Sequence, residues 1–160
     1  MDVDHLAQHP DCIEMIARWH FDQWGALTGA ATLEEYVPIL ATHAKSSTIP
    51  AVLVAREGTK PLGSVSLIEC DMTIRPDLSP WLAQLFVVPV QRRRGIGAAL
   101  VEATLAHARD CGLRRVYLYT SGTLPDYYER LGWTLHERVE YLGKLRTVMQ
   151  HDVEGGPSTE

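Results

Sequence analysis

Apolar and polar residues follow one another along the chain with two different periods, and each period predicts one kind of element. Apolar residues recur every three or four positions after Asp11, after Thr32 and after Gly95, which is typical of helices that bury one face. Shorter apolar or alternating runs between glycines and prolines predict strands at 50–56, 62–70, 81–88, 115–120, 133–140 and 144–151, and a short first strand near 3–8. The chain is therefore expected to mix helices with strands.

The order of these elements narrows the fold class. Runs 50–56 and 62–70, joined by a turn, indicate an antiparallel hairpin. The strand at 81–88, the following helix and the strand at 115–120 form one crossover, which requires two parallel strands. We therefore expect an α/β (α+β) protein with a mixed, mostly antiparallel sheet of six to seven strands, flanked by about four helices.

Local signals predict where the first two long helices begin. Asp11 with Glu14, and Thr32 with Glu35, have the spacing of a capping box, in which two side chains bond free N–H groups of the first turn. Pro38 lies inside the second helix and lacks the N–H that a helix interior needs. We therefore expect this second helix to be kinked or split.

Length and composition indicate one domain. A chain of 160 residues with 46% hydrophobic content can bury a substantial core, so we expect a single domain over residues 1–151 and a flexible tail over 152–160. No apolar run approaches the ~20 residues of a membrane span, and the N-terminus lacks the features of a signal peptide. The sequence therefore predicts a soluble, cytoplasmic protein without a membrane partner.

Charge and residue types argue against two classes of function. A formal net charge of −5 is unfavourable for general nucleic-acid binding, which depends on lysine and arginine. The three cysteines lack a C-x-x-C pattern and the seven histidines lack metal-ligand spacing. We therefore expect no nucleic-acid partner, no bound metal, and cysteines that are buried or half-buried thiols.

The most informative segment follows the strand at 81–88. Pro89 leads into Arg92-Arg93-Arg94-Gly95-Ile96-Gly97 at the start of a predicted helix. Backbone N–H groups at a helix N-terminus have no intrahelical acceptors, and glycine lets a phosphate approach them. Because three full positive charges are added to this helix end, the expected guest carries more than one phosphate.

Two common phosphate-binding motifs do not fit this segment. A dinucleotide fingerprint needs a third small residue where the chain has Leu100. A P-loop needs serine or threonine after Gly-Lys, whereas Leu145 follows Gly143-Lys144. What remains is the pattern Arg92-x-x-Gly95-x-Gly97, which resembles the pyrophosphate-binding segment of the GNAT superfamily of N-acetyltransferases.

A second segment strengthens this resemblance. Tyr128, on a short predicted helix at 123–131, is followed by Gly132-Trp133, similar to the superfamily's Tyr-x-x-x-Gly-aromatic signature. By element order the resemblance extends over residues 10–150. It implies the GNAT fold, whose sheet has a central splay, and acetyl-CoA as the acetyl donor.

The resemblance also implies which residues hold the coenzyme. The pyrophosphate would lie on backbone amides of 92–98, the pantetheine arm would pair with 86–88, and a polar side chain at the end of the strand at 115–120 would contact the arm or a water. The implied coenzyme-binding residues are Phe86, Val87, Val88, Arg92, Arg93, Arg94, Gly95, Ile96, Gly97, Ala98, Thr120 and Ser121.

Acetyl transfer needs a polarised thioester carbonyl, a proton donor for the departing thiolate, and a neutral amine, which a base can supply by removing a proton from the ammonium form. The resemblance assigns the first to the N–H of Val87 or Val88 and the second to Tyr128. Glu69 and Asp71, which end the strand at 62–70, are both candidates for the base, directly or through water.

The expected function is direct transfer of an acetyl group from acetyl-CoA to a primary amine of a small molecule or peptide. A cationic acceptor is expected because carboxylates lie at the candidate site. The alternative is a GNAT-fold module that binds acyl-CoA as a sensor without turnover. The identity of the amine and the presence of a homodimer both stay open.

Overall fold

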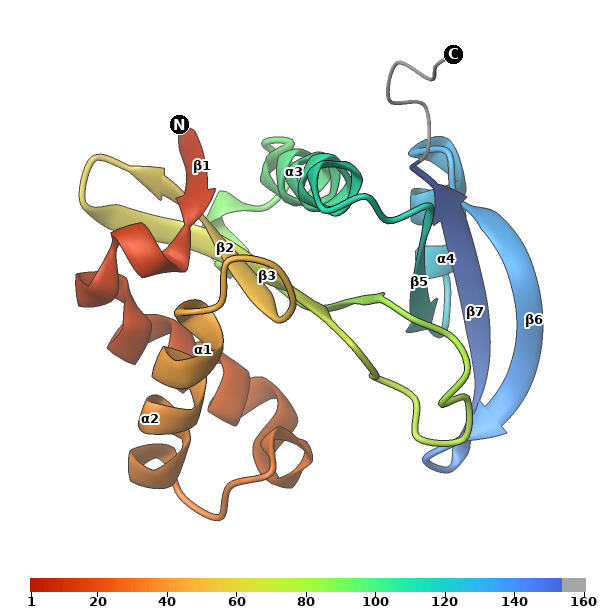
Figure 1. Cartoon of the computed structure of the whole chain (residues 1–160), viewed down its shortest axis with the longest axis horizontal. Helices are drawn as coiled ribbons and strands as arrows, with labels where there is room; N and C mark the ends of the chain where they lie inside the picture. Colours follow the sequence, from red (N-terminus) through yellow and green to blue (C-terminus); the bar gives the residue numbers. More distant parts are fainter. Residues whose placement is uncertain (154–160) are drawn as a thin grey trace. The chain divides into compact units, whose positions relative to one another are not determined.

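The computed structural model describes residues 1–153 as seven strands and four α-helices (Figure 1). The strands are β1 Asp2–His5, β2 Ala51–Glu57, β3 Lys60–Ile68, β4 Trp81–Val87, β5 Arg115–Thr120, β6 Thr134–Tyr141 and β7 Lys144–Asp152. The helices are α1 Ile13–Trp24, α2 Leu33–Ala44, α3 Ile96–Asp110 and α4 Leu124–Arg130. Of the residues in the predicted tail, Asp152 ends β7 and Val153 is buried, and the rest lie outside the described part of the chain.

The strands form one mixed sheet in the order β1-β2-β3-β4-β5-β7-β6. β1 with β2, β2 with β3, β5 with β7 and β6 with β7 are antiparallel, whereas β4 and β5 are parallel. Among the described residues, β4 and β5 pair at one position, Trp81 with Tyr117. Such a short pairing is what the predicted splay between these two strands requires. The predicted fold class is confirmed.

Contacts divide the chain into two compact units. Unit 1 consists of Met1–Leu67 and Gln84–Thr104, and unit 2 consists of Ile68–Ala83 and the described residues from Leu105 onward. The division cuts β4 between Ala83 and Gln84 and cuts α3 after Thr104.

The core of unit 1 is built from α1, α2 and β2, and the two helices lie side by side (Figure 1). Its buried side chains include Ile16 and Ala17 from α1, Leu40 from α2 and Val54 from β2. Burial of these apolar surfaces at roughly 25 cal/mol per Å² is what holds two amphipathic helices against the sheet.

The start of α2 is as predicted, but the start of α1 is not. The Thr32 hydroxyl accepts a hydrogen bond from the N–H of Glu35 at 3.2 Å. Asp11 instead lies in a 3-10 turn, Pro10–Cys12, and the residue before α1 caps it with no side chain. The 3-10 turn before α1 supplies carbonyl acceptors for N–H groups at the start of the helix, so a side-chain cap is not needed there.

Pro38 neither ends nor divides α2, contrary to one predicted outcome. The helix continues from Leu33 to Ala44 through it. Because Pro38 is only the sixth residue of the helix, it removes one backbone hydrogen bond, to the carbonyl of Glu34 in the first turn. The Thr42 hydroxyl donates back to the Pro38 carbonyl at 2.9 Å.

The core of unit 2 lies between the loop after β3 and the sheet formed by β5, β7 and β6. Met72 from that loop is buried together with Trp81, Tyr117 and Val148. The predicted β6–β7 hairpin is confirmed, with Tyr141 opposite Lys144 at its turn.

His20 makes the fold sensitive to acid. Its side chain is fully buried on α1, and burial, helped by His43, lowers its pKa to about 4. An unfolded histidine titrates near 6.5, so between these values the unfolded state binds more protons and stability falls as pH falls, by up to about 3 kcal/mol.

We therefore expect the urea midpoint of the wild type to drop between pH 7.5 and pH 4.5, and the drop to be smaller in His20→Gln. His136→Gln, at an exposed histidine, serves as the control and should follow the wild type. Equal drops in all three proteins would show that His20 does not carry the acid sensitivity.

Candidate active site

The segment between β4 and α3 in unit 1 has the backbone geometry of an anion-binding loop. After β4 the chain makes a 3-10 turn, Pro89–Gln91, and then two residues adopt left-handed backbone conformations, Arg93 at φ 68° and Gly95 at φ 78°. Alternation of left-handed with ordinary residues turns successive N–H groups toward one side and forms a concave nest for anions.

The N–H groups of this loop are available from Arg93 onward. The Arg92 N–H already donates to the Pro89 carbonyl at 3.2 Å. The first bond of α3 runs from the Ala99 N–H to the Gly95 carbonyl at 3.0 Å, so Ile96, Gly97 and Ala98 have no intrahelical acceptors. A Cβ placed on Gly95 would meet no heavy atom within 4 Å, so the nest is open at this point.

The three arginines of the segment are held differently. Arg92 donates through Nε to the Val87 carbonyl at 3.0 Å and lies 5.8 Å from the centroid of the Phe86 ring. Arg94 bonds the Gln91 side chain and Glu57, the latter at 3.2 Å. Arg93 is exposed and pairs with no other described residue. Its charge is therefore the most available one beside the nest.

The two candidate N–H donors, Val87 at the end of β4 and Val88 directly after it, face opposite edges of the strand. The Val88 N–H donates to the Leu62 carbonyl at 2.9 Å and is therefore occupied by the sheet. Because successive residues of a strand alternate, the N–H of Val87 points to the edge away from β3. Of the two residues, Val87 is the one whose N–H is left for a guest.

Gly63 explains how β3 and β4 approach so closely at this place. A Cβ there would lie 2.7 Å from the Phe86 carbonyl oxygen and 3.3 Å from Leu100. Any larger residue at Gly63 would push β4 or α3 away. The glycine therefore fixes the distance between the strand and the helix that together carry the anion loop.

Tyr128 occupies a buried position on α4 in unit 2, with 7% of its surface exposed. Its ring contacts Tyr127 and Trp133, with centroids at 5.1 and 6.1 Å. Its hydroxyl makes no hydrogen bond to another described residue. Burial, and then the neighbouring Tyr127, raise its pKa to about 12, so the phenol keeps its proton at neutral pH.

Glu69 and Asp71 follow β3 but differ in environment. Glu69 is exposed, whereas Asp71 is half-buried and burial raises its pKa to about 6. The charge of Asp71 in turn helps to raise the pKa of Tyr119, after burial, to about 12. A carboxyl group that titrates near neutral pH is suited to exchange protons at that pH.

The loop that carries Asp71 is anchored to the β6–β7 hairpin by contacts that the sequence did not reveal. Arg75 donates to both carboxylate oxygens of Glu137, at 2.6 and 2.9 Å. The Thr73 N–H donates to the Tyr141 hydroxyl at 3.2 Å. Bidentate pairs of this kind are geometrically selective, so they fix the loop on the hairpin. A loop without periodicity gives no sequence signal for these pairings.

The remaining predicted residues lie at the end of β5. Thr120 is buried and pairs with Thr147 across the sheet, and Ser121 is half-buried after the strand. Unit 2 thus holds Asp71, Thr120, Ser121 and Tyr128, while unit 1 holds the anion loop and the end of β4.

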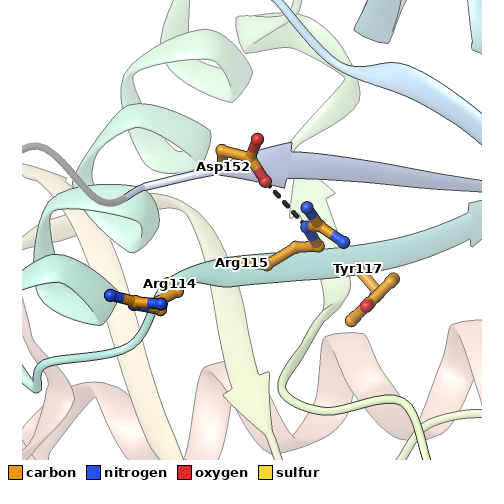
Figure 2. Close-up of a pocket in the computed structure, with 4 residues that line it drawn as sticks. All are labelled: Arg114, Arg115, Tyr117 and Asp152. Atoms are coloured by element: carbon orange, nitrogen blue, oxygen red, sulfur yellow. Dashed lines mark hydrogen bonds and ion pairs between the residues drawn. The ribbon is translucent and has the colours of Figure 1, made fainter.

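A pocket of about 310 Å³ opens at the other end of β5, lined by Arg114, Arg115, Tyr117 and Asp152 (Figure 2). Arg115 Nε lies 2.7 Å from Asp152 Oδ1, so these two lining residues form an ion pair with each other. None of the predicted site residues lines this pocket, and we assign it no role in the reaction.

Among the described residues, no three His, Cys, Asp or Glu side chains gather to hold a metal ion. No helix in the described part of the chain is long and apolar enough to cross a membrane. Cys12 is buried and Cys111 half-buried as predicted, but Cys70 is exposed because it lies on the loop that follows β3.

Comparison with known proteins defines the class to which this fold and anion loop belong. The model of the acetyltransferase (GNAT) family matches residues 12–133, most of the chain. The chain therefore belongs to the GNAT acetyltransferase family and is an acetyltransferase that acts on amine acceptors. No curated protein matches the sequence.

Solved structures with low sequence identity share the fold over the whole chain. An aminoglycoside 6'-N-acetyltransferase complexed with coenzyme A has a TM-score of 0.74 at 15% identity, covering 99% of this chain and 100% of its own. An aminoglycoside 6'-N-acetyltransferase from Enterococcus faecium has a TM-score of 0.73 at 16% identity, covering 99% and 100%. A Salmonella typhimurium protein with its cofactor acetyl-CoA has a TM-score of 0.68 at 16% identity, covering 100% and 98%.

Proposed function

We propose that the chain binds acetyl-CoA with its pyrophosphate on the N–H groups of Arg93–Ala98 and transfers the acetyl group directly to a cationic primary amine. The observation that carries this proposal is the open nest before α3, formed by left-handed Arg93 and Gly95. Helix N-terminal amides and a nest both favour phosphate, and the charge of Arg93 adds to them.

The end of β4 is suited to hold the pantetheine arm and the thioester. The Val87 N–H faces the edge away from β3, whereas the N–H of Val88 is bonded to Leu62. We assign polarisation of the thioester carbonyl to Val87, since a preorganised N–H needs no rearrangement as negative charge develops on the oxygen. Phe86 contacts both Trp19 and Arg92, and these contacts help to hold this strand end.

Tyr128 is proposed as the proton donor to the departing sulfur. As the C–N bond forms and the C–S bond breaks, the thiolate that leaves needs a hydrogen-bond donor. A phenol with a pKa of about 12 stays protonated throughout the working range of pH. Thr120 and Ser121 are proposed to contact the arm or a bound water.

Asp71 is the stronger of the two base candidates. The amine must lose a proton before or during attack, and a carboxylate whose pKa is about 6 accepts that proton more readily than an ordinary one. Glu69 is exposed on the same loop. A negative charge at this loop also favours a positively charged acceptor.

An acceptor screen tests the proposed function. Acetyl-CoA is incubated with aminoglycosides, linear polyamines and peptides with free N-termini or lysines, and release of free thiol is measured. Aminoglycosides are included because two of the similar structures are named for acetylating them. We expect turnover with a cationic amine that weakens as salt is added. Coenzyme A binding with turnover on none of these cationic amines would count against a cationic acceptor.

Removal of the Asp71 carboxylate should change the pH profile. With a pKa of about 6, the group is increasingly deprotonated as pH rises from 5 to 7, and kcat/KM should rise over the same interval. Asp71→Asn should lose this rise and lower kcat/KM at pH 7.5 by about 100-fold, which is the usual scale of a general base. Glu69→Gln is the matched comparison on the same loop and should keep the wild-type profile. The reverse result would identify Glu69 as the base.

A further inference from the structure

Gln84 has a backbone conformation that its residue type does not favour. It lies within β4 but has φ 56°, in the left-handed region. For a non-glycine residue this conformation costs roughly 1–2 kcal/mol, so something in the surrounding structure must hold it. A left-handed residue in a strand works as a bulge and changes the direction of the groups that follow it.

Two hydrogen bonds hold the side chain of Gln84. Its Oε1 accepts from the Ser66 hydroxyl of β3 at 2.9 Å, and its Nε2 donates to the Tyr36 hydroxyl of α2 at 3.4 Å. Ser66 and Tyr36 are 1% and 2% exposed, so both partners are fixed by burial. The amide therefore joins a strand and a helix of unit 1 at the position of the bulge.

The hydrogen bonds continue to α1. The Tyr36 hydroxyl, which accepts from Gln84, also forms a hydrogen bond with His20 Nδ1, 2.7 Å away. His20 is neutral because burial lowers its pKa to about 4. Ser66, Gln84, Tyr36 and His20 are thus joined in one chain of hydrogen bonds, which holds the amide of Gln84 at both of its polar atoms.

We propose that Gln84 is a positioning residue for acetyl transfer: its hydrogen-bonded amide holds the left-handed bend in β4 and thereby aims the N–H of Val87 at the acetyl carbonyl. Val87 is three residues beyond the bend in the same strand. This inference rests on the role proposed above for the Val87 N–H. The side chain of Gln84 acts through the backbone and does not itself touch the reacting atoms.

Two substitutions at the same position separate backbone positioning from side-chain contact. Gln84→Ala removes the amide and keeps a Cβ, so the left-handed bend loses its support. Gln84→Gly also removes the amide, but glycine adopts positive φ without a steric penalty. We expect kcat to fall about 30-fold in Gln84→Ala and to recover to within about threefold of wild type in Gln84→Gly, on the scale of about 2 kcal/mol of transition-state stabilisation.

Equal losses of kcat in both variants would overturn the proposal, since they would show that the amide itself is required. Wild-type kcat in Gln84→Ala would overturn it as well. A second test uses Ser66→Ala, which should lower kcat in the wild type but not in Gln84→Gly, where no amide is left to hold. Additive losses in the double variant would contradict the inference.

Failure of this inference can be distinguished from failure of the proposed function. The amide chemical shift of Val87 in the free protein reports the bend without any acceptor; it should change in Gln84→Ala and return in Gln84→Gly. Calorimetry of coenzyme A with the same variants should give dissociation constants within about threefold of wild type, because the loop before α3 is intact. Loss of coenzyme A binding in the wild type would count against the proposed function instead.

Discussion

Replacing Gly95 with valine is expected to abolish measurable coenzyme A binding while the protein stays folded. The N–H groups of the nest converge only if residue 95 keeps its φ of 78°, and a β-branched side chain strongly disfavours that conformation. The added methyl groups would also fill the open space over Gly95, where a Cβ meets nothing within 4 Å. Losing two hydrogen bonds to a charged phosphate, at roughly 1.5–3 kcal/mol each, weakens binding by about 100-fold or more.

Gly112→Val is the matched control for the strain of this substitution. Gly112 follows α3, has φ 79°, and a Cβ there also meets nothing within 4 Å. Both variants should therefore lose similar unfolding free energy, about 2 kcal/mol. Calorimetry should show near wild-type affinity for coenzyme A in Gly112→Val and none in Gly95→Val. Unchanged affinity in folded Gly95→Val would remove the nest from the proposed site.

The elements of the fold were predictable because burial imposes a period on the sequence. β5 at Arg115–Thr120 and the continuous helix after Gly95 follow directly from two-residue and 3.6-residue spacing. Helix ends were less predictable, since capping depends on which local partner is nearest. Asp11 has the spacing of a cap, yet the 3-10 turn that precedes α1 satisfies the helix end without its side chain.

Within the candidate site, the glycine loop was visible in the sequence, but the direction of individual groups was not. Val87 and Val88 are equivalent apolar residues in the pattern, and only the bond from Val88 to Leu62 separates them. Gln84 and Arg93 adopt positive φ without being glycine, so no residue type marks either bend. Such conformations are imposed by tertiary contacts, which a single sequence does not record.

Tyr128→Phe is expected to lower kcat by about ten- to a thousand-fold with little change in coenzyme A affinity. The substitution keeps the ring that packs on Tyr127 and Trp133 and removes only the hydroxyl. That hydroxyl makes no hydrogen bond to another described residue, so its loss leaves no partner unsatisfied and the thermal midpoint should barely move. An effect confined to kcat is the signature of an interaction made only in the transition state.

Tyr127→Phe on the same helix is the control, because Tyr127 is half-buried and contacts the Tyr128 ring, while successive residues of a helix project about 100° apart. It should keep wild-type kcat. Since burial raises the pKa of Tyr128 to about 12, the wild-type kcat should not decline between pH 7 and 10 through loss of this proton. Turnover within twofold of wild type in Tyr128→Phe, on an acceptor found in the screen, would mean that Tyr128 only packs and that water protonates the leaving thiolate.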